Sequence, residues 1–244
     1  MTFNIPTDSL VKTALMTVVA ATLLVACGDK SSAPKTSAVA TTSIQGRTAY
    51  ETQSDHALGS VDAPITIVEY ASVTCPHCAT WSLSVFPEIQ EKLIATGKVR
   101  YVFREFPTPP VDLANAGHLL ANCAPEEKFF DLLHIQFKRQ AQIRGSRDIK
   151  GEFIKLAKSA GMSEADFDAC MVNQTEIDHL QSVIVAGSNA GVTFTPTFFI
   201  NGKKTPKDTF TYASIEKLIA ETLGEPIPET SEDMDSGANK DTGH

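Results

Sequence analysis

Residues 64–78 read PITIVEYASVTCPHC, and this stretch decides the fold. The run 65–71 is apolar and rich in β-branched residues, which predicts a buried strand. The helical spacing of residues 78–95 predicts a helix directly after it. Cys75 and Cys78 therefore lie where a strand passes into a helix, with Cys75 near the helix N-terminus. Unpaired backbone N–H groups there favour a thiolate over a thiol, so the motif predicts a redox-active pair.

Two cysteines at this spacing are also half of a zinc site, because a structural zinc ion usually takes four ligands. The sequence has no second pair at that spacing, and its six histidines show no ligand-like pairing. We therefore expect neither a metal nor a cofactor, with a metal site or a purely structural bridge as the alternatives. Within the motif, His77 can add a hydrogen-bond donor or a positive charge beside the thiolate.

The first 26 residues predict export. Residues 13–26 form an apolar stretch that is too short to span a bilayer and has the length of a signal-peptide core. The stretch leads into Leu24-Val25-Ala26-Cys27, which resembles the lipobox of bacterial lipoproteins, in which the cysteine carries the lipid. An ordinary signal peptide is the alternative. We expect an exported protein, periplasmic or at the cell surface, that is anchored to a membrane by a lipid at Cys27.

The sequence contains five cysteines, an odd number that needs an explanation in an exported protein. If Cys27 carries a lipid, two pairs remain, Cys75 with Cys78 and Cys123 with Cys170. A bridge in the second pair would close a loop of about 48 residues and stabilise the fold by roughly 3–4 kcal/mol in the chain-entropy model. Two buried free thiols at these positions are the alternative.

Composition separates two tails from a folded centre. Residues 27–53 are rich in Ser, Thr, Ala and Lys without a hydrophobic period, which predicts a flexible tether. Residues 225–244 are acidic and polar, which predicts a disordered tail. The formal net charge of −8 argues against nucleic acid as a partner.

Strand and helix signals between the tails follow a recognisable order. A run rich in β-formers predicts a second strand over 98–106, parallel to the first. Residues 111–190 give helical signals only. Strand signals return over 197–203, where Asn201-Gly202 predicts a hairpin turn, and a last helix is expected over 212–223. This is the order of a thioredoxin fold, an α/β fold, with an all-helical insertion between its βαβ and ββα halves.

These signals divide the folded centre into three parts. We expect the first thioredoxin-like half over 54–110, the inserted helical domain over 111–190 and the second thioredoxin-like half over 191–224.

Three motifs in the expected order make the chain similar to the DsbA family of exported thiol oxidases. They are the Cys-Pro-His-Cys motif with its Pro76-His77 dipeptide, the segment TPTFFING at 195–202 and the segment GSVDAP at 59–64. The likeness extends from about residue 58 to residue 224. It is greatest with the branch that has an extra disulfide in its helical domain, where Cys123 and Cys170 fit.

The resemblance implies roles for individual residues. Cys75 would be the nucleophile and Cys78 the buried resolving thiol. Glu69, at the position of the family's buried acid, would accept or relay the proton of Cys78. Pro196 would follow a cis peptide bond, and the backbone of Thr195 would pair with a client strand. The alternatives are a trans proline at a strand start and a solvent-facing Glu69.

The activity implied is that of an oxidase that introduces disulfides into exported client proteins with free cysteines. A membrane quinone-linked, DsbB-like reoxidase would be its partner. We expect a monomer, because residues 28–53 are too short and polar to supply the dimerisation domain of family isomerases. An isomerase or reductase of the same fold is one alternative, and a non-catalytic substrate- or metal-binding lipoprotein is another.

Overall fold

The computed structural model describes residues 47–227. The predicted signal peptide, the predicted lipidation site Cys27 and the acidic tail beyond residue 227 lie outside the described residues, as does the predicted tether up to residue 46. Within residues 47–227, no helix has the length and apolar character needed to cross a membrane.

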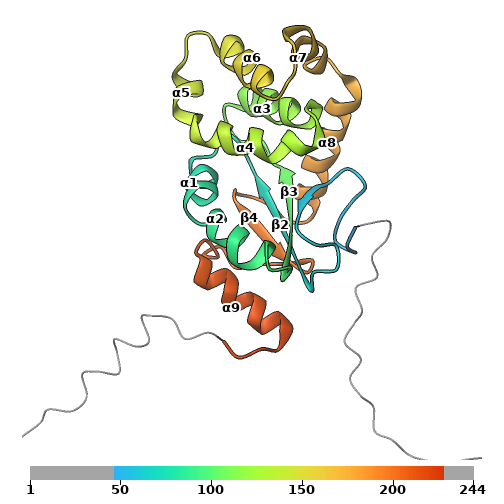
Figure 1. Ribbon diagram of the computed structural model, residues 1–244, viewed down its shortest axis with the longest axis vertical. Helices are drawn as coiled ribbons and strands as arrows, with labels where there is room; N and C mark the ends of the chain where they lie inside the picture. The colour runs from blue at the N-terminus through green and yellow to red at the C-terminus, as the bar shows by residue number, and fades with distance from the viewer. Residues whose placement is uncertain (1–46, 228–244) are drawn as a thin grey trace, which may run out of the picture. The chain divides into compact units, whose positions relative to one another are not determined.

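A mixed sheet forms the centre of the fold (Figure 1). Its strands lie in the spatial order β1-β3-β2-β4-β5 and comprise β1 (His56–Leu58), β2 (Ile65–Ala71), β3 (Val99–Glu105), β4 (Thr197–Ile200) and β5 (Lys203–Lys204). β2 and β3 run parallel, whereas the other neighbouring strands run antiparallel. Every residue of the middle strand β2 is buried, in agreement with its continuous apolar run.

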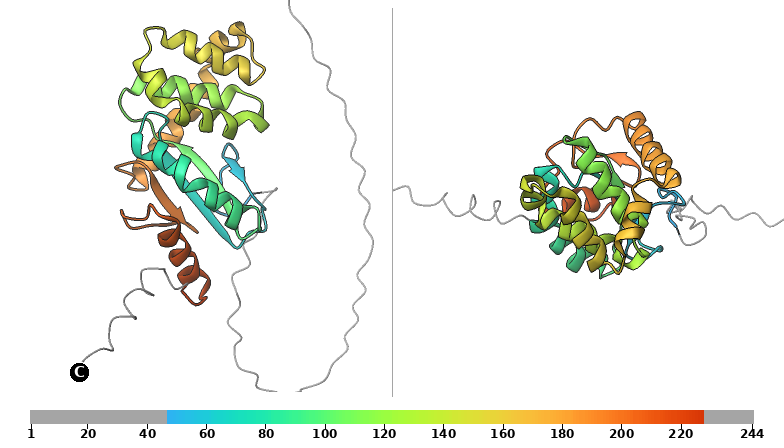
Figure 2. Two further views of the ribbon diagram at one scale, coloured as in Figure 1. Left: turned by 60° about the vertical axis from the view of Figure 1, so that its left-hand side comes forward. Right: turned by 90° about the horizontal axis from the view of Figure 1, so that it is seen from above.

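Two groups of helices surround the sheet. The helices of the two thioredoxin-like halves are α1 (Pro76–Ser84), α2 (Phe86–Ile89), a π-helical turn η1 (Gln90–Ile94) and α9 (Tyr212–Leu223). The helices between β3 and β4 are α3 (Val111–Cys123), η2 (Glu126–Lys128), α4 (Phe129–Lys138), α5 (Gln140–Gly145), α6 (Ile149–Ser159), α7 (Glu164–Cys170) and α8 (Gln174–Asn189). Figures 1 and 2 show α3–α7 gathered at one end of the sheet and α9 at the other. The predicted thioredoxin fold with a helical insertion is confirmed.

One apolar core continues from the sheet into the helical insertion. It includes Ile67 and Phe198 on the sheet and Phe129 and Leu156 in the insertion, all at most 2% exposed. α1 packs directly against α4, so the helix that carries the cysteine motif rests on the insertion. The insertion is therefore part of the support of the cysteine pair.

The structure divides the helix predicted over 78–95 into three pieces. α1 ends at Ser84, and α2 begins at Phe86 with Pro87 in its first turn. Because Pro87 has no N–H to donate to the carbonyl four residues earlier, an unbroken α-helix cannot pass through this position. α1 also begins at Pro76, two residues before the predicted start, since the fixed φ of proline suits the first helical position.

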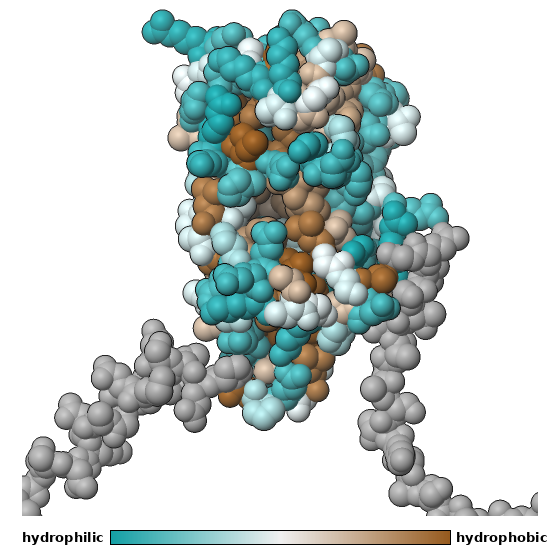
Figure 3. All heavy atoms as spheres, viewed as in Figure 1, coloured by the Kyte–Doolittle hydropathy of each residue, from teal (hydrophilic) through white to brown (hydrophobic). Residues whose placement is uncertain are grey.

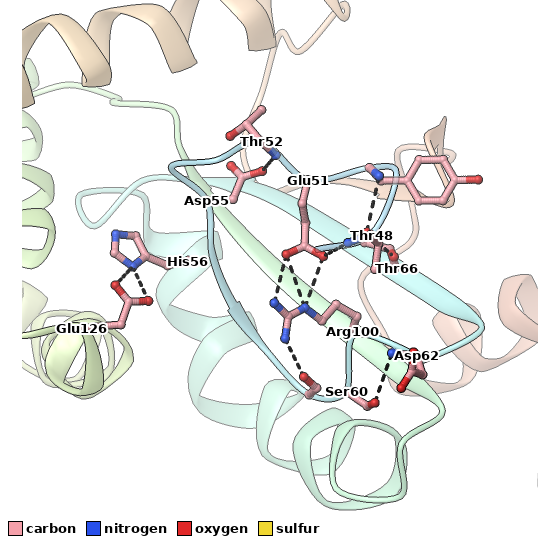
Figure 4. Close-up of polar contacts among 12 residues, drawn as sticks. Thr48, Glu51, Thr52, Asp55, His56, Ser60, Asp62, Thr66, Arg100 and Glu126 are labelled. Atoms are coloured by element: carbon pink, nitrogen blue, oxygen red, sulfur yellow. Dashed lines mark hydrogen bonds and ion pairs between the residues drawn. The ribbon is translucent and has the colours of Figure 1, made fainter. Parts of the chain in front are cut away.

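The prediction that the tether extends to residue 53 is wrong for residues 47–53. Figure 4 shows the Glu51 carboxylate facing Arg100 of β3, whose Nε and Nη2 lie 3.2 and 3.0 Å from its oxygens. Asp55 pairs in the same way with Arg104, at 2.6 Å. Both carboxylates are buried, so this segment is fixed to β3 by ion pairs. Its polar composition reflects those partners on β3, which lie about 50 residues away in the sequence.

Candidate active site

The two cysteines of the motif lie at the start of α1. Cys75 caps the helix with an extended backbone (φ −81°, ψ 121°), and Pro76 occupies the first turn, where a missing N–H costs nothing. Both cysteines are free thiols in this structure. Cys75 is 6% exposed and Cys78 0%, so an incoming sulfur can reach Cys75 first.

The surroundings of Cys75 favour its thiolate. A hydrogen bond from the Cys78 side chain is the largest influence that lowers the pKa of Cys75 from 9.0 to about 5, against the opposing effect of burial. The Thr195 side chain and the backbone N–H groups of Cys78 and His77 also donate to the thiolate and lower this pKa further. The His77 side chain itself is exposed, so the structure shows its contribution through its backbone.

Cys78 has the opposite tendency. Burial raises the pKa of Cys78 well above its ordinary value, and the hydrogen bond to Cys75 and the charges of Glu69 and Cys75 add to the effect. Only one of the two thiols therefore ionises readily. This asymmetry is what a pair needs if one sulfur is to exchange with other molecules and the second is to close the disulfide.

The loop that precedes β4 faces the outer cysteine. The Thr195–Pro196 peptide bond is cis, and the Sγ atom of Cys75 donates a hydrogen bond to the Thr195 carbonyl at 3.4 Å. The two segments are 120 residues apart in sequence and meet because β4 pairs with β2. The structure thus brings together the motif and the proline loop that the sequence singled out.

Glu69 lies below the cysteine pair in the middle of the sheet. It is 2% exposed, and its carboxylate accepts a hydrogen bond from the Tyr101 hydroxyl. Burial raises the pKa of Glu69 to about 8; the charge of Cys75 acts in the same direction, while the Tyr101 hydrogen bond opposes it. At neutral pH this carboxyl group is therefore protonated and can hold a proton beside two thiols.

Tyr101 also lines a recess of about 610 Å³ between α4 and the α1–α2 segment. Figure 3 shows this face of the molecule hollowed, with apolar residues inside the hollow. Tyr101 belongs to β3, beside Glu69 of β2, and its ring contacts Trp81 with centroids 6.3 Å apart. Tyr101 therefore hydrogen-bonds to the buried carboxyl group of Glu69 and also forms part of the wall of the recess. Sequence reasoning missed Tyr101, although strand alternation places it on the same face of the sheet as Phe103, the residue paired with Glu69.

A second group of residues missed by sequence reasoning comes from α5. The Nε2 atom of Gln140 donates to the carbonyls of Val73 and Cys75, at 2.8 and 3.0 Å. Nη1 of Arg144 donates to the Thr74 carbonyl at 3.4 Å. These side chains hold the loop before α1 from the side of the insertion, and no local sequence pattern signals such a contact.

The other cysteine pair lies away from this site. A disulfide joins Cys123, the last residue of α3, to Cys170, the last residue of α7. Over residues 47–227, no cluster of three or more His, Cys, Asp or Glu side chains is placed to hold a metal ion.

Comparisons with known proteins agree with this geometry. Residues 51–221 match the family model described as thioredoxin. The chain is 32% identical over 177 residues to a Rickettsia bellii protein named "Putative protein-disulfide oxidoreductase", with 70% of this chain and 66% of that protein covered. The chain thus spans just under two thirds of that relative's length.

Solved structures give the same result. Alpha-DsbA1 of Wolbachia pipientis superposes with a TM-score of 0.62 at 26% identity, over 71% of this chain and 93% of that one. BdbD of Bacillus subtilis, at 23% identity and a TM-score of 0.64 over 70% and 94% of the chains, shares the fold. The chain belongs to the thioredoxin family and, within it, to the DsbA-like proteins.

Proposed function

We propose that this chain is a thiol:disulfide oxidase that transfers the Cys75–Cys78 disulfide to exported proteins with free cysteines. The observation that carries the proposal is the division between the two thiols, with the pKa of Cys75 lowered to about 5 and that of Cys78 raised. A stabilised thiolate stabilises the reduced protein, and a stable reduced form makes the disulfide form a strong oxidant.

The reaction begins with the disulfide closed between Cys75 and Cys78. A client thiolate attacks the Sγ atom of Cys75, and the Cys78 sulfur leaves as a thiolate. Because the pKa of Cys78 is raised, this sulfur takes up a proton, and the protonated carboxyl group of Glu69 is placed to supply one. Tyr101 holds that carboxyl group through its hydroxyl.

A second client thiolate then attacks the client sulfur of the mixed disulfide. The Cys75 sulfur leaves as a thiolate, which needs no proton at neutral pH because its pKa is about 5. The client gains a disulfide, and the protein keeps two electrons as its reduced dithiol. During both steps, the backbone of Thr195 pairs with the client strand and holds the client sulfur beside Cys75.

The proposal extends to the surroundings in which the reaction occurs. The segment Leu24-Val25-Ala26-Cys27 supports export and a lipid anchor at Cys27. A membrane quinone-linked, DsbB-like reoxidase would accept the two electrons and close the disulfide again.

The test is direct transfer in both directions. The oxidised protein should convert a peptide with two free cysteines to its disulfide within a stoichiometric turnover, and the Cys75→Ser variant should not. The reduced protein should open the same peptide disulfide far more slowly than it was formed. Fast reduction with slow oxidation would identify a reductase, and failure in both directions would leave a non-catalytic lipoprotein.

A further inference from the structure

A cationic surface lies beside the proline loop. The ring of Phe194, directly before Thr195, lies under two ammonium groups, with Lys207 Nζ 5.2 Å and Lys204 Nζ 5.8 Å from its centroid. Lys204 also donates to the Gly191 carbonyl, which fixes it against the same loop. We call Phe194, Lys204 and Lys207 the lysine platform. A cation over an aromatic face is held in place without losing its charge.

Three of the segments that border the cysteine pair contain no carboxylates, whereas β2 contributes the buried Glu69, whose pKa is raised to about 8. α1, α5 and residues 190–207 include neither Asp nor Glu, and they contribute Arg144, Lys203, Lys204 and Lys207. The whole chain, by contrast, has a formal net charge of −8. The carboxylate nearest in sequence to the platform is that of Asp208, next to Lys207. The net charge of these three segments is therefore opposite in sign to that of the whole chain.

The platform adjoins Thr195, the residue whose backbone is proposed to pair with a client strand. Phe194 directly precedes Thr195, whose carbonyl is 3.4 Å from the Sγ atom of Cys75. Residues in an extended strand advance about 3.3 Å each, so the two positions on either side of a client cysteine lie within about 7 Å of it. We expect acidic side chains at these positions to come close enough to Lys204 and Lys207 for attraction between their charges.

We propose that the lysine platform selects client segments that carry Asp or Glu within two positions of the reacting cysteine. The inference rests on the proposed oxidase function and names the substrate class of the same site. Attraction between an exposed ammonium and a carboxylate changes a rate constant by about 1.5- to 5-fold per pair, so two pairs give about 2- to 25-fold, and we expect a preference of about 3- to 10-fold, in the middle of that range. Because such pairs are screened over a Debye length, the preference must weaken as salt rises.

The test uses three peptides of one length, each with two free cysteines, whose flanking positions are Asp and Glu, Asn and Gln, or Lys. The kcat/KM of the oxidised full chain should be about 3- to 10-fold higher for the acidic than for the neutral peptide and lowest for the basic one. The ratio of acidic to neutral should approach one at about 0.5 M salt, where the Debye length is only a few ångströms.

Two variants locate the preference. Lys204→Glu combined with Lys207→Glu should reverse the order of the three peptides, and Lys207→Glu alone, which leaves the Lys204 contact to Gly191 in place, should remove most of it. Lys158→Glu on α6 makes the same change in net charge as Lys207→Glu, away from the platform, and should keep the wild-type ratio. Ratios between peptides are compared because a lost cation also alters the reactivity of Cys75, which affects all three equally.

The outcomes distinguish failure of this inference from failure of the proposed oxidase function. Equal kcat/KM values for the three peptides, or an unchanged preference in the Lys207→Glu variant, would show that the lysine platform does not select acidic clients. The proposed oxidase function would be unaffected by either result. No oxidation of any peptide would overturn both. Equal peptide rates, together with sedimentation on phosphatidylglycerol vesicles that the double variant loses, would assign the lysines to a membrane surface instead.

Discussion

The two cysteine pairs of this chain have the same chemistry and opposite surroundings. Cys75 and Cys78 share one helical turn at the start of α1, where one thiol ionises easily and the other resists ionisation. Cys123 and Cys170 are 47 positions apart and tie the ends of α3 and α7 together within the insertion. The difference teaches that the position of two cysteines in the fold decides whether they take part in thiol–disulfide exchange or form a structural disulfide. The start of a helix that faces the Thr195–Pro196 loop favours thiol–disulfide exchange. The C-terminal ends of two helices favour a permanent disulfide.

The pairs should also differ in what they do for stability. Closing a loop as short as that between Cys75 and Cys78 restricts the unfolded chain little, whereas the Cys123–Cys170 bridge restricts a long loop. We therefore expect the first pair to govern activity and the second to govern the free energy of unfolding. Each of the following predictions tests this division of roles between the two cysteine pairs.

The largest effect is expected from the first pair. Cys75→Ser should abolish oxidation of a dithiol peptide, because no sulfur remains within reach of the client. Cys78→Ser, mixed with a client that carries a disulfide, should instead accumulate mixed disulfides: the Cys75 thiolate attacks the client disulfide, a client thiolate leaves, and the internal thiol that would release the client is gone. Non-reducing electrophoresis with a cysteine-containing client distinguishes the two results. Equal activity in Cys75→Ser would end the thiol-exchange account.

Removal of the second pair should lower stability and spare the chemistry. The Cys123→Ala/Cys170→Ala double variant should lose roughly 3–4 kcal/mol in its free energy of unfolding, as the chain-entropy model gives for such a loop. Its rate of peptide oxidation at 25 °C should stay within about twofold of the parent. Urea unfolding and single-turnover kinetics measure both. A large loss of rate in protein that is still fully folded would contradict the division.

The third effect concerns the proton partner of the first pair. The pKa of Glu69 is raised from 4.5 to about 8 by burial, so the stability that its protonated form provides is complete below pH 4.5 and is lost as the pH rises through 8. Glu69→Gln, which stays neutral and can still accept from Tyr101, should therefore stabilise the reduced protein by up to about 4–5 kcal/mol at pH 8.5 and leave it unchanged at pH 4.

Urea unfolding at the two pH values measures this difference. Glu127→Gln removes an exposed carboxylate from the same chain and serves as the control, with little expected change at either pH. If Glu69→Gln destabilises the protein at pH 8.5, the folded protein stabilises the Glu69 carboxylate, the pKa of Glu69 is not raised, and Glu69 is no proton store for Cys78.

The smallest effect should come from the contact between the insertion and the cysteine loop. Gln140→Ala removes the hydrogen bonds to the carbonyls of Val73 and Cys75 and should cost about 1–2 kcal/mol in unfolding free energy, with a several-fold fall in oxidation rate. Gln142→Ala on the same helix, which reaches Glu152 instead, is the matched control. Equal behaviour of the two variants would show that the insertion does not hold the loop.

The sequence predicts those parts of the site whose chemistry is local. The strand over 65–71, the helix start at the cysteines and the turn at Asn201-Gly202 follow from propensity and spacing, and the structure has β2, α1 and the β4–β5 hairpin at these places. The thioredoxin order of elements follows from the same signals.

Contacts between segments that are distant in the sequence could not be predicted in this way. Tyr101 meets Glu69 through strand register, and Gln140 reaches Cys75 from a helix 65 positions away. β1, with only three residues, is too short for a period-2 pattern to reveal. The polar segment ending at residue 53 resembles a linker until its partner Arg100 is known. Such features depend on the folded arrangement and leave no local pattern.

The most direct test of the division between the two pairs is a redox titration of the full chain against glutathione, with alkylation and mass mapping of Cys75, Cys78, Cys123 and Cys170. We predict that Cys75 and Cys78 open together at a potential nearer about −120 mV, the value of DsbA, than about −270 mV, that of thioredoxin. Cys123 and Cys170 should stay closed throughout, as structural disulfides with potentials below about −300 mV do. A potential for Cys75–Cys78 near −270 mV, or opening of both pairs together, would contradict the account.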